Sequence, residues 1–128
     1  MPASGFYEWK TAAGKKYPYY VRPKGNELFG LAGVTEYWKG PEVEIHTVCL
    51  ITTAPNEPMA PIHDWMPVII PLDSCRAWLD PLNEDRVQLK GLIASYPAER
   101  MEAHPVSKAV RRSAMTITGG GSLRCVRL

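Results

Sequence analysis

The sequence predicts a single α+β domain, and three observations lead to this fold class. The chain has 128 residues, 45% of them hydrophobic, which suits one domain that buries its own core. Its first part divides into strand-length segments separated by turns that contain proline or glycine. Helical patterns follow only after residue 72, so we expect a mixed β-sheet core with two or three short helices.

Five segments have the length and composition of β-strands. They are residues 5–10, 16–22, 28–34, 44–53 and 66–70. Ala13-Gly14 and Lys24-Gly25-Asn26 supply turn residues between the first three, so we expect antiparallel hairpins there. LFGLAGV and IHTVCLITT are apolar or β-branched at nearly every position, which predicts central strands that are covered on both faces.

Two helical patterns follow the strands. Asp73 or Ser74 can cap a first helix over residues 75–79. Asn83 can cap a second helix, whose apolar stripe runs from Val87 to Ile93. The segment MEAHPVS, residues 101–107, is then expected to be extended again.

The charge distribution separates the end of the chain from the rest. The formal net charge of +2 is too small to indicate a nucleic-acid partner by itself. Four arginines and no acidic residue lie in residues 111–128, which also contain three consecutive glycines. We therefore predict a domain at residues 1–110 and a divergent basic, Gly-rich tail at residues 111–128.

The three cysteines, Cys49, Cys75 and Cys125, show no CxxC or Cys/His spacing. Neither a disulfide framework nor a zinc site is favoured, and no metal or cofactor is expected. The sequence has no signal peptide and no apolar run of about 18 residues, the length that a membrane helix needs. It favours a cytoplasmic protein without a membrane partner.

The stretch SGFYEWK, residues 4–10, places one carboxylate among aromatic residues. In a strand, Phe6 and Glu8 project to one face, and Tyr7 and Trp9 project to the other. Partial burial would suit Glu8 to proton transfer near neutral pH. The alternative is an acid on an edge strand that pairs with Lys10.

A second candidate is PNEPMAPIHDWMP, residues 55–67, in which four prolines stiffen the loop around His63 and Asp64. A histidine on a rigid loop is well placed for general acid–base catalysis, and Asp64 could orient it or cap a turn.

In HPVSKAV, His104 and Ser107 lack a nucleophile elbow, so Ser107 is expected to serve a turn rather than catalysis. A metal site of His63, Asp64 and His104 has no familiar ligand spacing. GGGS lacks the residues of a phosphate-binding loop.

Three separated motifs together resemble the SOS response-associated peptidase (SRAP) family. They are PASGFYEWK at residues 2–10, TTAPNEPMAPIHDWMPVIIP at residues 52–71 and HPVSKAV at residues 104–110. Their order and spacing match the family, with a Trp-containing helix between the second and the third. The resemblance implies an α+β fold with a barrel-like core and a positively charged groove for a nucleic-acid strand.

The resemblance also implies a function: abasic site processing proteins recognise abasic sites in single-stranded DNA and form a DNA–protein crosslink. In the family, an N-terminal cysteine condenses with the sugar aldehyde while a glutamate and a histidine assist the proton transfers. By motif these two map to Glu8 and His63, and the glutamate is also implicated in autocatalytic removal of a propeptide. Trp9 is expected to stack on bases and Arg22 to contact the strand.

The departures from the family lead to further expectations. Position 2 is Pro2, not cysteine, and the resemblance covers only the C-terminal portion of the family domain, so we expect the N-terminal part of the fold to be missing. The chain is then inactive, or uses another amine such as that of Pro2; the alternative is a non-catalytic fragment that binds single-stranded DNA or a protein. Trp65 also replaces a family arginine that would contact phosphate.

Missing strands would leave sheet edges exposed, so we expect a homodimer or a strand-exchanged assembly. The expected location is the cytoplasm, in association with the nucleoid.

Overall fold

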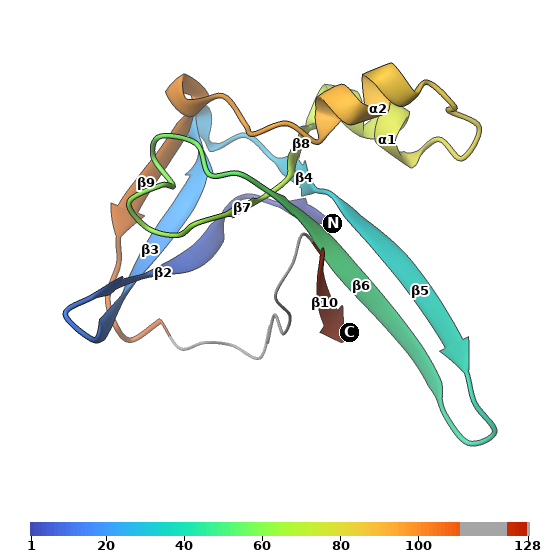
Figure 1. Ribbon diagram of the computed structural model, residues 1–128, viewed down its shortest axis with the longest axis horizontal. Coiled ribbons are helices and arrows are strands. Elements are labelled where there is room, and N and C mark those ends of the chain that lie inside the picture. The colour runs from blue at the N-terminus through green and yellow to red at the C-terminus, as the bar shows by residue number, and fades with distance from the viewer. Residues whose placement is uncertain (111–122, 128) are drawn as a thin grey trace.

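The computed structural model describes residues 1–110 and the backbone of residues 123–127. Most of the predicted tail, residues 111–128, therefore lies outside the described residues. The described part confirms the α+β class, with small antiparallel sheets and a few short helices (Figure 1).

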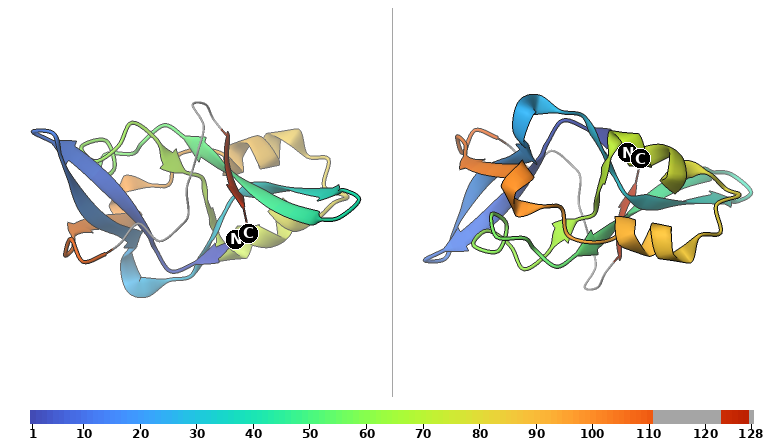
Figure 2. Two further views of the ribbon diagram at one scale, coloured as in Figure 1. Left: turned by 90° about the horizontal axis from the view of Figure 1, so that it is seen from below. Right: turned by 90° about the horizontal axis from the view of Figure 1, so that it is seen from above.

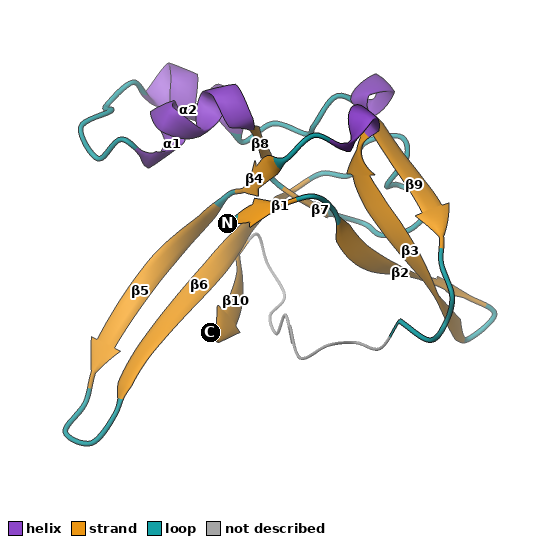
Figure 3. Ribbon diagram, turned by 180° about the vertical axis from the view of Figure 1, so that it is seen from behind, coloured by secondary structure: helices purple, strands orange, loops and turns teal. Residues whose placement is uncertain are grey.

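Three sheets contain the strands. The first consists of β1 (Pro2–Ala3), β4 (Phe29–Leu31) and β8 (Ile69–Pro71), in that order. The second consists of β2 (Phe6–Ala12), β3 (Lys15–Pro23) and β9 (Met101–Pro105), in that order. The third has the order β10 (Leu123–Arg127), β6 (Glu44–Thr53) and β5 (Gly33–Lys39), and β7 (Met66–Pro67) pairs with the end of β6. Figure 3 shows that the first sheet lies in the middle of the molecule and that the second and third sheets extend away from it in different directions.

The helices are short. They are the 3-10 turns η1 (Lys24–Asn26), η2 (Leu72–Ser74) and η3 (Ala98–Arg100), and the α-helices α1 (Cys75–Leu79) and α2 (Arg86–Leu92). The bounds predicted for the first helix are confirmed, but its predicted side-chain cap was wrong, because the hydroxyl of Ser74 donates to Asp73 at 3.0 Å and caps no helix N–H. The cap predicted for the second was wrong, because Asp85 caps α2 by accepting the N–H groups of Val87 and Gln88, each at 3.0 Å. Asn83 instead accepts the N–H of Asp85 at 3.0 Å and so shapes the turn before the helix.

The first predicted hairpin is confirmed. Ala13 and Gly14 have φ angles of 48° and 71° and connect β2 to β3, as a two-residue turn with two positive φ values requires. The second predicted hairpin was wrong, because β3 and β4 belong to different sheets. Gly25 and Asn26, with φ angles of 84° and 58°, instead redirect the chain between these sheets.

The first and third sheets meet at a backbone junction formed by Ala32, Ile51 and Val68. The N–H of Ala32 donates to Val68 at 2.9 Å, that of Val68 to Ile51 at 2.9 Å, and that of Ile51 to Ala32 at 3.0 Å. Ala32 and Val68 are buried, together with Ile70, and helix residues such as Trp78 pack against this small cluster. The main core lies next to it and gathers residues from all three sheets: Val21, Phe29, Leu31, Leu50, Met59, Ile62, Met66, Ile69, Tyr96 and Met101.

The expectation that LFGLAGV and IHTVCLITT are central strands covered on both faces was wrong. LFGLAGV is divided between β4 and the first residues of β5, and in IHTVCLITT only Leu50 is buried. Phe29 and Leu31 of β4 are buried, but every residue from Val34 to Lys39 is exposed. The chain leaves the core at Ala32 and continues into a long hairpin of β5 and β6. Figure 2 shows that this hairpin and the β2–β3 hairpin point to opposite ends of the molecule. In the described residues the sheets do not close into the expected barrel.

Two further features of the described residues concern cysteines and membrane segments. Cys49 is disulfide-bonded, whereas its sequence spacing favoured no disulfide framework. The pairing of β10 with β6 places the backbone of Cys125 opposite Cys49, a proximity that spacing along the chain cannot reveal. None of the helices in the described ranges has the length and hydrophobicity needed to cross a membrane.

Candidate functional site

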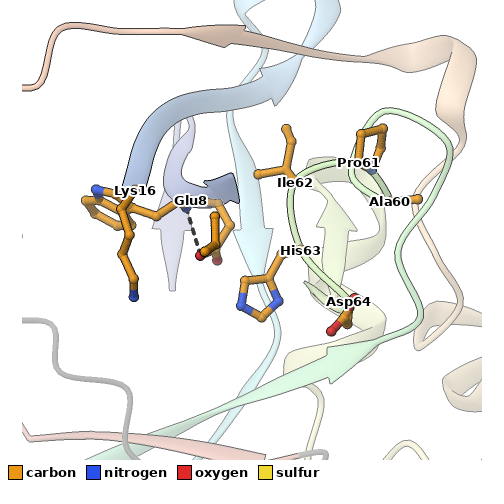
Figure 4. A pocket seen from close by; sticks show the side chains of 9 residues that line it. Glu8, Lys16, Ala60, Pro61, Ile62, His63 and Asp64 are labelled. Carbon is orange, nitrogen blue, oxygen red and sulfur yellow. Dashed lines mark hydrogen bonds between the residues drawn. The ribbon is translucent and has the colours of Figure 1, made fainter. Parts of the chain in front are cut away.

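A cavity of about 350 Å³ lies between the β2–β3 hairpin and the loop that connects β6 to β7. The hairpin contributes Glu8, Trp9, Thr11 and Lys16 to its lining, and the loop contributes a segment that ends with His63 and Asp64 (Figure 4). Glu8 and His63, which the sequence predicted as catalytic residues, thus lie in one cavity. Its volume is within the usual range for a small-ligand site, about 300–1,000 Å³.

Glu8 reaches the cavity because of its position in β2. Phe6, two residues earlier, packs against the main core, so this face of the strand points inward. Glu8 is only half-buried, and its Oε1 accepts the N–H of Trp9 at 3.1 Å. Within the described residues Glu8 forms no ion pair, so the alternative pairing with Lys10 is not observed.

The loop that carries His63 is fixed by its own side chains. The side chain of Asn56 donates to the carbonyl oxygen of Tyr96 at 2.8 Å, and its Oδ1 accepts the N–H of Met59 at 3.3 Å. Met59 and Ile62 are buried in the main core. The N–H of His63 donates to the carbonyl oxygen of Met59 at 3.0 Å, which ends the loop in a helical turn. The loop is therefore rigid without belonging to a sheet.

His63 lines the cavity and has one unpaired ring nitrogen. Its Nδ1 is buried and has no hydrogen-bond partner in the described structure. Asp64 is exposed and does not bind His63, so the predicted orienting role of Asp64 is not observed. The indole of Trp65 packs against the imidazole instead, with ring centroids 4.4 Å apart at 64°. An unpaired imidazole nitrogen can accept a proton from a bound ligand or donate one to it.

The two residues predicted to bind DNA are in different surroundings. Trp9 lines the cavity. Arg22 does not; it forms an ion pair with Glu102 at 2.7 Å and donates a hydrogen bond to Asn26. Lys16, which the sequence reasoning did not single out, also lines the cavity. The signal that could have revealed Lys16 is the composition of residues 9–26, which include four lysines and one arginine but no acidic residue.

The remaining candidates lie outside the cavity lining. Ser107 accepts the N–H of Ala109 at 3.2 Å, as expected for a turn residue. His104 contacts the ring of Tyr20, with centroids 5.7 Å apart. Pro2 pairs with Gly30 in the first sheet. Among the described residues, no three His, Cys, Asp or Glu side chains gather as a metal site would require.

Comparison with known proteins supports the family resemblance of the sequence. The sequence pattern of the SOS response associated peptidase (SRAP) family matches residues 1–113. The abasic site processing protein YoqW of Bacillus subtilis is 44% identical over 112 residues, which are 86% of this chain and 50% of that protein. The abasic site processing protein YedK of Escherichia coli is 32% identical over 117 residues, which are 84% of this chain and 49% of that protein. The chain thus spans about half the length of these relatives.

A solved structure has the same fold. The crystal structure of a protein from Bacteroides thetaiotaomicron matches with a TM-score of 0.76 and 26% identity, covering 84% of this chain and 48% of that one.

Proposed function

This chain belongs to the SOS response associated peptidase family, and from that membership we propose that it binds single-stranded DNA at abasic sites and moves protons during their covalent processing. The observation that carries the proposal is the cavity in which Glu8 and His63 lie together. The names of the relatives, which are abasic site processing proteins, support the choice of substrate.

The proposed chemistry starts from the open-chain aldehyde of an abasic sugar. An amine attacks the aldehyde carbon, and water leaves to give an iminium; if a thiol is linked to the amine, it closes a thiazolidine ring. Glu8 would accept the proton of the attacking amine, and His63 would exchange a proton with the aldehyde oxygen through Nδ1. Glu8 is also the proposed carboxylate of the peptidase reaction named in the family description.

Strand binding is the second part of the proposal. The β2–β3 hairpin borders the cavity, and residues 9–26, which follow Glu8, carry five basic and no acidic side chains. Phosphates on both sides of an abasic site would follow this hairpin, while Trp9 would stack on a neighbouring base. Arg22 would join this contact by releasing Glu102. We place this activity in the cytoplasm, at the nucleoid, where the DNA is.

The test uses a single-stranded oligonucleotide with one abasic site, incubated with and without borohydride and analysed on a denaturing gel. We expect a covalent band with the wild-type protein. Glu8→Gln and His63→Gln should each reduce the rate of its formation by about 100-fold or more, the usual effect of losing a general acid or base. Equal rates in all three proteins would remove both residues from the mechanism.

A binding measurement separates recognition from covalent chemistry. Fluorescence anisotropy compares an intact strand with one that carries a tetrahydrofuran abasic analogue, which has no aldehyde. We expect tighter binding of the analogue strand, and both Gln variants should retain this preference. Equal affinity for both strands, without any covalent band, would overturn the proposed function.

That second result would favour a different function: a non-catalytic module that binds single-stranded DNA. This candidate is supported by the basic residues of the hairpin. It predicts salt-sensitive binding to intact and abasic strands alike.

A further inference from the structure

Lys16 supplies the only amine among the described residues that line the Glu8–His63 cavity. We propose that its ε-amine condenses with the aldehyde of the abasic sugar to form a reversible imine. This inference rests on the proposed function and adds the identity of the attacking group. It gives the chain a covalent intermediate that needs no N-terminal cysteine.

The hairpin holds Lys16 at the cavity. Lys16 lies on β3 opposite Thr11 of β2, and the two-residue turn at Ala13 and Gly14 fixes this register. Figure 4 shows the lysine side chain extending away from the hairpin ribbon, on the same side as Glu8, with His63 beyond Glu8. Lys16 is exposed and forms no ion pair within the described part of the chain, so its amine is available.

The proposed step balances without an oxidant or reductant. The lysine ammonium loses a proton to the Glu8 carboxylate, and the nitrogen lone pair attacks the aldehyde carbon. The carbonyl electron pair moves to oxygen, which takes a proton from His63 or water. The nitrogen gives up a second proton to water, which leaves a neutral carbinolamine with a lone pair on nitrogen. A second proton converts this hydroxyl into water, which leaves as the nitrogen lone pair forms the C=N bond. The net change is the loss of one water, and hydrolysis reverses it.

The charges of the cavity favour this product. An iminium ion is positively charged, and two carboxylates, those of Glu8 and Asp64, belong to the cavity lining. Fixed negative charge near a developing cation stabilises it. None of the described lining residues has a thiol, so no ring closure follows and the imine remains reversible.

Lys15 provides a matched control. It is the neighbouring lysine on the same strand and is also exposed, but it does not line the cavity. Lys16→Arg and Lys15→Arg both keep the positive charge, and an arginine does not form an imine under these conditions. Each variant is mixed with a saturating abasic strand, treated with borohydride, and analysed by gel and by peptide mass spectrometry. Saturation prevents a change in affinity from affecting the yield.

We expect the wild type and Lys15→Arg to give equal trapped product, with the mass increment on Lys16, and Lys16→Arg to give at least tenfold less. Equal trapping of both variants, or an increment on another residue, would overturn the inference. So would the absence of trapped wild-type product; a retained preference for the tetrahydrofuran strand would then leave the proposed function standing.

Discussion

At the scale of single residues, Asn56 connects packing to the site. The side chain of Asn56 forms hydrogen bonds with the backbone of Tyr96 and of Met59, and its amide nitrogen also contacts the sulfur of Met101 at 3.6 Å. These contacts join the His63 loop to the start of β9 and to the segment before η3. A side chain that neither touches the cavity nor titrates therefore decides where His63 lies.

Asn56→Ala should lower the free energy of unfolding by about 1–3 kcal/mol, because it removes the side-chain donor to the carbonyl oxygen of Tyr96. The N–H of Met59 keeps its second acceptor, the backbone carbonyl oxygen of residue 56. The loop then moves, so the yield of the covalent band should fall while the affinity for the tetrahydrofuran strand changes less. Urea unfolding and the gel assay measure the two effects.

Asn83→Ala is the control for this prediction. Asn83 also makes three hydrogen bonds, to Ala77, Gln88 and Asp85, but it lies beside the helices and away from the cavity. If both variants lost the covalent band to the same degree, general destabilisation would explain the effect and Asn56 would have no positioning role.

At the scale of secondary-structure elements, α2 illustrates how a cap selects the start of a helix. Asn83 and Asp85 both favour helix starts, and a sequence pattern cannot distinguish them. The structure distinguishes them because the Asn83 side chain is occupied with Ala77 and Gln88, which leaves Asp85 to receive the first N–H groups of the helix.

Asp85→Ala should reduce stability by about 1 kcal/mol, the usual cost of losing an N-cap, whereas Asp85→Asn should restore most of it. Urea unfolding of both variants measures the difference. An Asp85→Ala protein as stable as the wild type would show that α2 does not depend on this cap.

The long hairpin is the other element that needs explanation. Val34 and Trp38, on one face of β5, are 50% and 52% exposed, and Tyr37 contacts the ring of His46 with centroids 4.5 Å apart. Desolvation and a hydrogen bond to Glu44 raise the pKa of Tyr37, so its phenol stays protonated at neutral pH. The apolar and aromatic side chains of this hairpin are thus exposed, and none of the described residues covers them.

At the scale of the whole molecule, this uncovered hairpin leads to a prediction about assembly. In the described residues β5 is the edge of its sheet, and exposed apolar edges promote strand pairing between chains. We expect a homodimer or a strand-exchanged assembly at micromolar concentration, measured by light scattering after size-exclusion chromatography.

Replacing Val34 and Trp38 by lysine should shift this assembly towards the monomer, because charge on an edge strand opposes pairing. Leu79→Lys and Leu82→Lys, at two exposed leucines near the helices, serve as the matched control. A wild-type protein that is strictly monomeric would contradict the prediction, and equal effects of both double variants would place the contact elsewhere than on β5.

The sequence by itself determined the α+β class, the first hairpin turn, and the limits of β6 and α1. Each of these depends on a local signal: alternation, turn residues, caps or a short motif. The family pattern then confirmed the relationship that three separated motifs indicated.

Tertiary structure alone decided which residues share the cavity and which strands stay exposed. Glu8 and His63 meet because β2 packs its inner face on the core while Asn56 and Met59 anchor a distant loop beside it. Lys16 joins them through the register of a hairpin, and β5 leaves the core at a junction made only of backbone hydrogen bonds. Local patterns record the period of a strand, but contacts between distant segments depend on how the whole chain packs.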